Sequence, residues 1–132
     1  MQMKQNANSR RLGQLAREKI AHILLFEISD PRLEMVTVTS CEVSVDRSVC
    51  HVYVTADAHR YAEVLAALQG AKGRIRSLLG QSLSWRVTPE LFFHIDQSAD
   101  EAERIARALK DVPQSLSVEK DEFGYPLNQN KE

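Results

Sequence analysis

Basic residues surround a glycine near the middle of the chain, in a pattern suited to binding phosphate groups. From Lys72 to Arg86 the sequence has four basic residues and no acidic one. Gly73 stands between Lys72 and Arg74, and because glycine has no side chain, another backbone can approach it closely. The charges and the glycine are suited to contact with a phosphate backbone such as that of RNA. A plain bend between two helices is an equally good interpretation of this glycine.

Helical spacing extends this candidate surface. In a helix, Lys72 and Arg76 lie one turn apart on one flank of the apolar positions, and Arg74 lies on the other flank. Arg10 and Arg17 belong to an earlier helical segment, where they share a face that the apolar residues do not use. The predicted RNA-binding surface consists of Arg10, Arg17, Lys72, Gly73, Arg74, Arg76 and Arg86, with Arg11 and Lys19 as weaker candidates.

The sequence shows no pattern typical of catalysis, a cofactor or a metal ion. The histidines are scattered, and neither Cys41 nor Cys50 has a CxxC or HxxxH partner. There is no phosphate-binding loop, dinucleotide fingerprint or nucleophile elbow. A nuclease would be the enzyme most compatible with an RNA surface, but the sequence singles out no carboxylate cluster for it. We therefore expect a binding protein with no catalytic residue, metal or cofactor, and with free thiols.

Composition indicates one globular domain. The chain has 132 residues, of which 43% are hydrophobic and 27% charged, as in ordinary globular domains. The formal net charge of -1 argues against a polyanionic partner, but residues 96–132 hold nine acidic and five basic residues, so the rest is more basic. The N-terminus is too polar for a secretion signal, and no apolar run approaches the roughly 18 residues that span a bilayer. We expect a cytosolic monomer with no membrane contact.

The first half of the chain predicts a helix followed by a β-hairpin. Apolar residues recur at helical spacing from Ser9 until the Asp30-Pro31 step, which ends the helix. Residues 36–45 and 49–55 are rich in β-branched side chains and predict two strands joined by a tight turn. The alternation of these strands slips after Val38, which predicts a bulge there.

The second half predicts two helices, a third strand and a last helix. Gly70 and Gly73 separate a helical stripe capped by Asp57 from a second stripe that begins at Ile75. Two glycines would cost a continuous helix about 2 kcal/mol relative to alanine, which favours a kink or tight turn between two helices. Residues 91–95 predict a short strand, and a final helix follows.

The predicted order is α-β-β-α-kink-α-β-α. Because a helical crossover separates the second and third strands, we expect an α+β sandwich in which helices cover a three-stranded sheet. Three regions are expected: a flexible N-terminal arm over residues 1–9, a folded domain over 10–111, and a flexible acidic C-terminal tail over 112–132.

Aromatic residues on the predicted strands are suited to stacking on RNA bases. Tyr53, Phe92 and Phe93 are the candidates. Phe93 falls on the apolar side of its strand and is expected in the core. Phe92 and His94 point to the opposite side and are expected to be partly exposed. Trp85, before this strand, is equally suited to packing and to stacking.

The glycine element and its surroundings resemble known proteins. The order of elements around Gly70-Ala71-Lys72-Gly73 resembles a type II KH domain, and residues 10–110 resemble the ribosome-binding factor A family. The matching motifs, in chain order, are Asp30-Pro31-Arg32-Leu33 with Val36-Thr37-Val38, Val43-Ser44-Val45-Asp46, Val52-Tyr53-Val54, Ala71-Lys72-Gly73 with Ile75-Arg76-Ser77-Leu78-Leu79-Gly80, and Arg86 with Thr88-Pro89-Glu90-Leu91, Phe93 and Asp96.

The resemblance implies a factor that binds the free 30S ribosomal subunit and its 16S rRNA during late maturation. It also implies support of 16S rRNA processing, a role in cold adaptation, and release assisted by an assembly GTPase. The family has an Ala-x-Gly kink where other KH domains have a GxxG loop, and Gly70 to Gly73 fits both patterns. Two alternatives stay open: a generic KH-type module for single-stranded RNA, and a protein-interaction adaptor that acts through the acidic C-terminal region.

Overall fold

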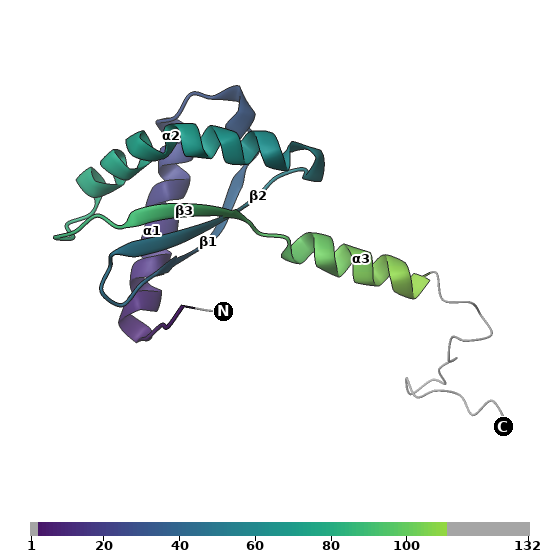
Figure 1. Ribbon diagram of the computed structural model, residues 1–132, viewed down its shortest axis with the longest axis horizontal. Coiled ribbons are helices and arrows are strands. Elements are labelled where there is room, and N and C mark those ends of the chain that lie inside the picture. The colour runs from purple at the N-terminus through teal and green to yellow at the C-terminus, as the bar shows by residue number, and fades with distance from the viewer. Residues whose placement is uncertain (1–2, 111–132) are drawn as a thin grey trace, which may run out of the picture. The chain divides into compact units, whose positions relative to one another are not determined.

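The computed structural model describes residues 3–110, and Figure 1 shows how their helices and strands are arranged. The elements are α1 (Ala7–Phe26), β1 (Thr37–Val43), β2 (Val49–Thr55), α2 (Tyr61–Ser82), β3 (Glu90–Ile95) and α3 (Ser98–Lys110), with short 3-10 turns at Pro31–Leu33 and Ala58–Arg60. The chain divides into two compact units after Asp96. Within the described residues, three α-helices and a mixed three-stranded sheet confirm the predicted α+β class, with one helix fewer than expected.

Helix α1 begins earlier than predicted. The Asn6 side-chain oxygen accepts a hydrogen bond from the Ser9 amide at 2.8 Å, and the Ser9 hydroxyl accepts one from the Asn6 amide at 2.8 Å. This reciprocal capping box satisfies two amides near the helix start. The expected flexible arm over residues 1–9 is therefore wrong for residues 7–9, which are helical. The sequence hid this start because serine stands where such a box usually has Glu or Gln.

The sheet has the strand order β1-β2-β3, with β1 and β2 antiparallel and β2 and β3 parallel. The hairpin pairs Val43 with Cys50, and its register shifts between Val38 and Ser40, which confirms the predicted bulge. A parallel pair needs a long crossover between its strands. Helix α2 supplies it.

Helix α2 runs without interruption through both Gly70 and Gly73, and Figure 1 shows it as one continuous coil. The expected division into two helices at a kink or turn is wrong. Two glycines cost a helix about 2 kcal/mol, whereas each fully buried Val, Leu or Ile side chain contributes roughly 1.5–3 kcal/mol. Burial outweighs the glycines, because α2 buries a stripe that consists of Val64, Ala67, Leu68, Ile75 and Leu79.

Helices α1 and α2 cover the same face of the sheet. The core between these layers includes Ile20 of α1, Val52 of β2 and Leu68 of α2, all completely buried. Helix α1 lies especially close to β1 at Gly13, where an added Cβ atom would stand 2.5 Å from the carbonyl oxygen of Cys41. Packing therefore requires glycine at this position.

The two cysteines of the hairpin are free thiols. Cys50 is completely buried and Cys41 is partly buried. A hydrogen bond with Cys50, followed in importance by burial, raises the pKa of Cys41. Cys41 is therefore a neutral thiol at physiological pH, and it is poorly suited to act as a nucleophile.

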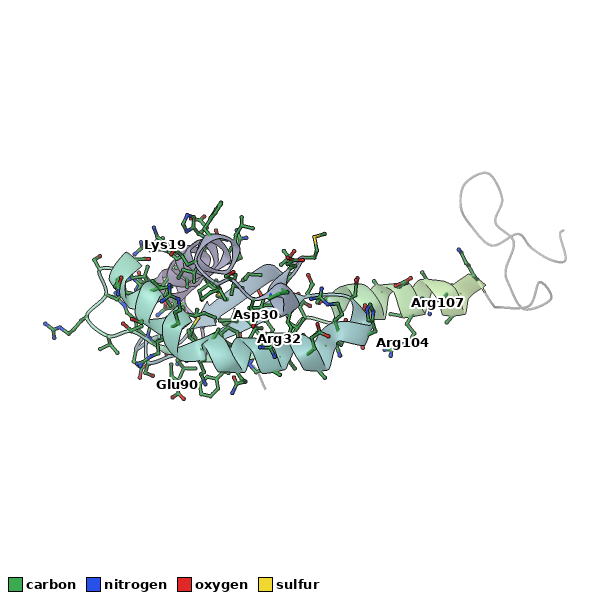
Figure 2. All side chains as sticks on the ribbon, turned by 90° about the horizontal axis from the view of Figure 1, so that it is seen from above. Lys19, Asp30, Arg32, Glu90, Arg104 and Arg107 are labelled. Carbon is green, nitrogen blue, oxygen red and sulfur yellow. The ribbon has the colours of Figure 1, made fainter. Side chains whose placement is uncertain are left out.

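Helix α3 is the described part of the second unit. Its charged side chains pair along the helix surface, Arg104 with Glu101 at 3.1 Å and Arg107 with Glu103 at 3.0 Å. Figure 2 labels both arginines on this helix. Exposed pairs of this kind contribute little to stability, so the cations of α3 can be altered at little cost to the stability of this helix.

The first compact unit ends at Asp96, and α3 belongs to the second. The expected domain over 10–111 included this last helix. The tail expected over 112–132 lies outside the described residues. Among residues 3–110, no helix combines the length and the apolar character needed to cross a lipid bilayer.

Candidate nucleic-acid interface

One flank of helix α2 carries Lys72 and Arg76 and faces strand β3. The Lys72 ammonium nitrogen lies 5.0 Å from the centroid of the Phe92 ring. The Arg76 guanidinium donates hydrogen bonds to the carbonyl oxygens of Thr88 and Pro89, at 2.8 and 3.0 Å. These contacts confirm that Lys72 and Arg76 share a flank. They also give Arg76 a structural role, since it holds the segment that leads into β3.

Arg74 lies on the opposite flank of α2, as predicted. It lines a hollow of about 340 Å³ together with Gly70, Asp30 and Arg32. Figure 2 shows Asp30 and Arg32 beside α2. Arg74 therefore faces the segment that follows α1, and the two flanks of α2 present their cations in different directions.

The cations of α2 are not neutralised by the described carboxylates. Asp30 pairs with Arg32 at 2.9 Å, and the hydrogen bond from Arg32 holds the pKa of Asp30 below its usual value. Within residues 3–110, Lys72, Arg74 and Arg76 form no ion pair. Their charges are therefore available to phosphate groups.

Gly70 and Gly73 are exposed on α2, and packing among residues 3–110 does not account for them. Within this part of the chain, a Cβ atom at either position would have no neighbouring atom within 4 Å. Alanine would fit at each position and would favour the helix by about 1 kcal/mol. A helix surface without side chains at these two points allows the backbone of a partner to approach closely. The predicted role of Gly73 thus keeps its physical basis, although the helix does not break there.

Arg10 and Arg17 lie along one side of α1. They line a groove between this helix and β1, with a volume of about 480 Å³, and Thr39, Ser40 and Glu42 contribute to its lining. The prediction that these two arginines share a face is confirmed. Their groove adjoins β1, whereas the contacts of Lys72 and Arg76 are with β3 and the segment before it.

Arg86 is exposed, in the segment between α2 and β3. The neighbouring Trp85 ring is partly buried against the core, and the Arg47 guanidinium carbon lies 5.8 Å from its centroid. This favours the packing role for Trp85. The contacts thus place the predicted cations in separate groups: on α1, on the two flanks of α2 and in this segment. Binding of one RNA by all of these groups stays a prediction.

Sequence reasoning missed a pair of histidines on the face of the sheet opposite α1 and α2. Nδ1 of His51 lies 2.8 Å from Nε2 of His94. Strand alternation predicts that each histidine lies on this face. Their contact also depends on the parallel pairing of β2 with β3, which brings the two side chains together. Among residues 3–110, no group of three or more His, Cys, Asp or Glu side chains is arranged to hold a metal ion.

Known proteins are similar to this chain over most of its length. A family model described as ribosome-binding factor A matches residues 8–109. The ribosome-binding factor A of Dictyoglomus thermophilum is 38% identical over 105 residues, which cover 77% of this chain and 88% of that protein. The one from Azoarcus sp. is 31% identical over 129 residues, which cover 96% of this chain and 98% of that protein.

Solved structures are similar as well. The crystal structure of ribosome-binding factor A from Thermus thermophilus has a TM-score of 0.59 at 32% identity, over 66% of this chain and 94% of that one. A homology model of the Thermus thermophilus factor, fitted into the cryo-EM map of its complex with the 30S subunit, has a TM-score of 0.58 at 29% identity. That comparison covers 68% of this chain and 97% of the other.

The fold is that of a small α+β protein of the KH-like type. Its sequence places it more narrowly. The chain belongs to the ribosome-binding factor A family.

Proposed function

We propose that this chain binds the free 30S ribosomal subunit through 16S rRNA during late maturation. We further propose that it supports processing of the 16S rRNA and contributes to cold adaptation. Family membership supports a ribosomal partner, and the related Thermus thermophilus factor has been fitted into the map of a 30S complex. The observation in this chain that carries the proposal is the middle of α2, where exposed backbone at Gly73 lies between Lys72, Arg74 and Arg76.

Phosphate binding by this surface has a measurable signature. Each phosphate that a lysine or arginine neutralises releases counterions, so affinity falls as salt rises. If about five such contacts form, affinity for the subunit should fall by roughly two decades between about 50 and 200 mM salt. A binding mode dominated by apolar protein contacts would respond far less.

The test is sedimentation of the purified protein with separated ribosomal subunits at those two salt concentrations. We expect the wild type to sediment with the 30S subunit at low salt and to be largely released at high salt. The triple substitution Lys72→Glu, Arg74→Glu and Arg76→Glu should abolish sedimentation at both. Because Arg76 also holds the segment before β3, the double substitution Lys72→Glu and Arg74→Glu should be compared, with thermal unfolding measured for each variant.

Helix α3 offers a control with the same change in charge. The substitutions Arg104→Glu, Arg107→Glu and Lys110→Glu alter three exposed cations of the second unit, and we expect normal 30S sedimentation. Loss of sedimentation in this variant, with normal behaviour of the α2 variant, would favour an adaptor acting through the C-terminal region. Equal affinity of the wild type for short unstructured RNA and for subunits would favour a generic single-stranded RNA module.

We also propose that the protein acts as a monomer in the cytosol, without a cofactor, and that an assembly GTPase promotes its release from the subunit. Energy for release must come from a partner, because the sequence has no nucleotide-binding motif. Adding a subunit-binding GTPase with GTP to the sedimented complex should release the chain, and a non-hydrolysable analogue should release less.

A further inference from the structure

The face of the sheet that α1 and α2 leave uncovered carries a row of four aromatic rings. Tyr53 and His94 are stacked, with centroids 5.1 Å apart and planes at 27°. His94 lies 4.9 Å from His51, and His51 lies 5.5 Å from Phe92, with interplanar angles of 33° and 31°. The register of β2 and β3 produces the row, because it places His51 beside Phe92 and Tyr53 beside His94.

The rings of the row are fixed in position and partly open to solvent. The 2.8 Å contact between His51 Nδ1 and His94 Nε2 requires one ring to donate and the other to accept, which restricts rotation of both. Phe92 is 36% exposed, and Tyr53, His51 and His94 are half-buried. Burial, followed by the neighbouring His51, lowers the pKa of His94, so this ring is neutral at physiological pH. Flat rings ordered before binding lose little conformational entropy when a partner stacks on them.

Charged side chains lie at both sides of the row. On the β3 side, the Lys72 ammonium lies 5.0 Å from the Phe92 centroid. On the β1 side, Glu42 is the cross-strand partner of His51, and Arg10 and Arg17 line the same groove as Glu42. A polyanionic strand whose bases lie on the rings can place phosphates next to Lys72, whose ammonium pairs with no carboxylate among residues 3–110. This places its backbone next to the cationic flank of α2.

We propose that the ring row, formed by Tyr53, His94, His51 and Phe92, is a second RNA contact of this chain and binds unpaired bases by stacking. Lys72 joins it to the phosphate-binding surface of α2. The inference rests on the proposed 30S function and deepens it, because it adds a single-stranded RNA segment to the partner. Base stacking on an aromatic side chain tolerates any base, so the contact selects unpaired RNA rather than a sequence.

The test measures the affinity of a short fluorescently labelled oligouridylate for the full chain at several salt concentrations. Phe92→Leu and His94→Leu each keep side-chain bulk but remove a ring, and each should weaken binding about tenfold. Their slope of log affinity against log salt should stay that of the wild type. Lys72→Gln should instead reduce this slope by about 0.7, because it removes one phosphate contact. Thr37→Ala, an exposed change in the same sheet outside the row, should alter neither quantity.

Wild-type affinity in both ring variants would overturn the inference, as would a loss that comes with a reduced salt slope. A second measurement does not depend on variant folding: crosslinking of 4-thiouridine-containing RNA to the wild-type protein. Crosslinks to Tyr53 or Phe92 are expected, and crosslinks confined to α1 and α2 would also overturn the inference. Sedimentation of the wild type with 30S subunits decides the proposed function separately, since its failure there leaves the oligonucleotide result standing.

Discussion

The first unit contains helical glycines of two kinds, at tightly packed positions and at open ones. Where α1 meets β1, the space beside Gly13 is occupied by the Cys41 carbonyl, and near the end of α2 an added Cβ atom on Gly80 would stand 2.6 Å from the Thr88 hydroxyl. In the middle of α2, Gly70 and Gly73 face no other atom of the described residues. Internal packing requires glycine at the first kind of position. At the second kind, the described packing does not require glycine, which points to a partner.

The largest effect is expected from Gly13→Ala. The added methyl group would press on the backbone of β1, which cannot turn aside as a side chain can, so we expect destabilisation by about 3 kcal/mol, at the upper end for overpacking. Urea or thermal unfolding measures it. An unchanged midpoint would contradict the view that packing requires this glycine.

A smaller loss is expected from Gly80→Ala, because the group in its way is the Thr88 side chain. Rotation or a slight shift of Thr88 should limit the cost to about 1 kcal/mol. The double variant Gly80→Ala with Thr88→Ala should recover stability relative to the sum of the single changes, and a double-mutant cycle measures this coupling. Additive losses would show that the clash lies elsewhere.

Gly73→Ala should act in the opposite direction on stability. We expect it to stabilise the protein by about 1 kcal/mol, because alanine favours a helix and has room here, and to weaken 30S binding several-fold. Unfolding and sedimentation, measured on the same preparation, test both halves, with Gly70→Ala as a comparison one turn away. If the variant is more stable and binds as well as the wild type, Gly73 is not part of the interface, and only the cations of α2 remain as candidates.

The smallest effect on stability is expected from lowering the pH, through Asp46 in the hairpin turn. This turn is distant in sequence from the glycines of α2. Asp46 accepts hydrogen bonds from the Ser48 and Ser44 hydroxyls at 2.7 and 2.8 Å, and these bonds lower its pKa from the usual 3.8. A lowered pKa stabilises the folded state above 3.8 and ceases to do so as the pH falls through the folded-state value. Asp46→Asn should flatten the fall of unfolding free energy between about pH 5 and 3. A steeper fall would contradict this.

The periodicity of the sequence correctly predicted features that depend only on the geometry of a single strand or helix. The bulge near Val38 followed from a slip in strand alternation, and the opposite flanks of Lys72 and Arg74 followed from helical spacing. The break at Gly73 was wrongly predicted, because the cost of glycine is local whereas the burial that offsets it depends on the whole helix packing against the sheet. The contact between His51 and His94 was beyond reach for a similar reason, since the crossover through α2 sets the parallel register.

Arg76 connects the two proposed RNA contacts mechanically. Its guanidinium has five N–H donors, and two of its nitrogens already hold the carbonyls of Thr88 and Pro89. The remaining N–H groups can donate to a phosphate. Because the Arg76 side chain lost its conformational entropy when the protein folded, it loses little more on binding. The affinity of a ligand that binds there therefore depends on whether the residues before β3 are ordered. Fraying of this edge strand would weaken RNA binding before the protein as a whole unfolds.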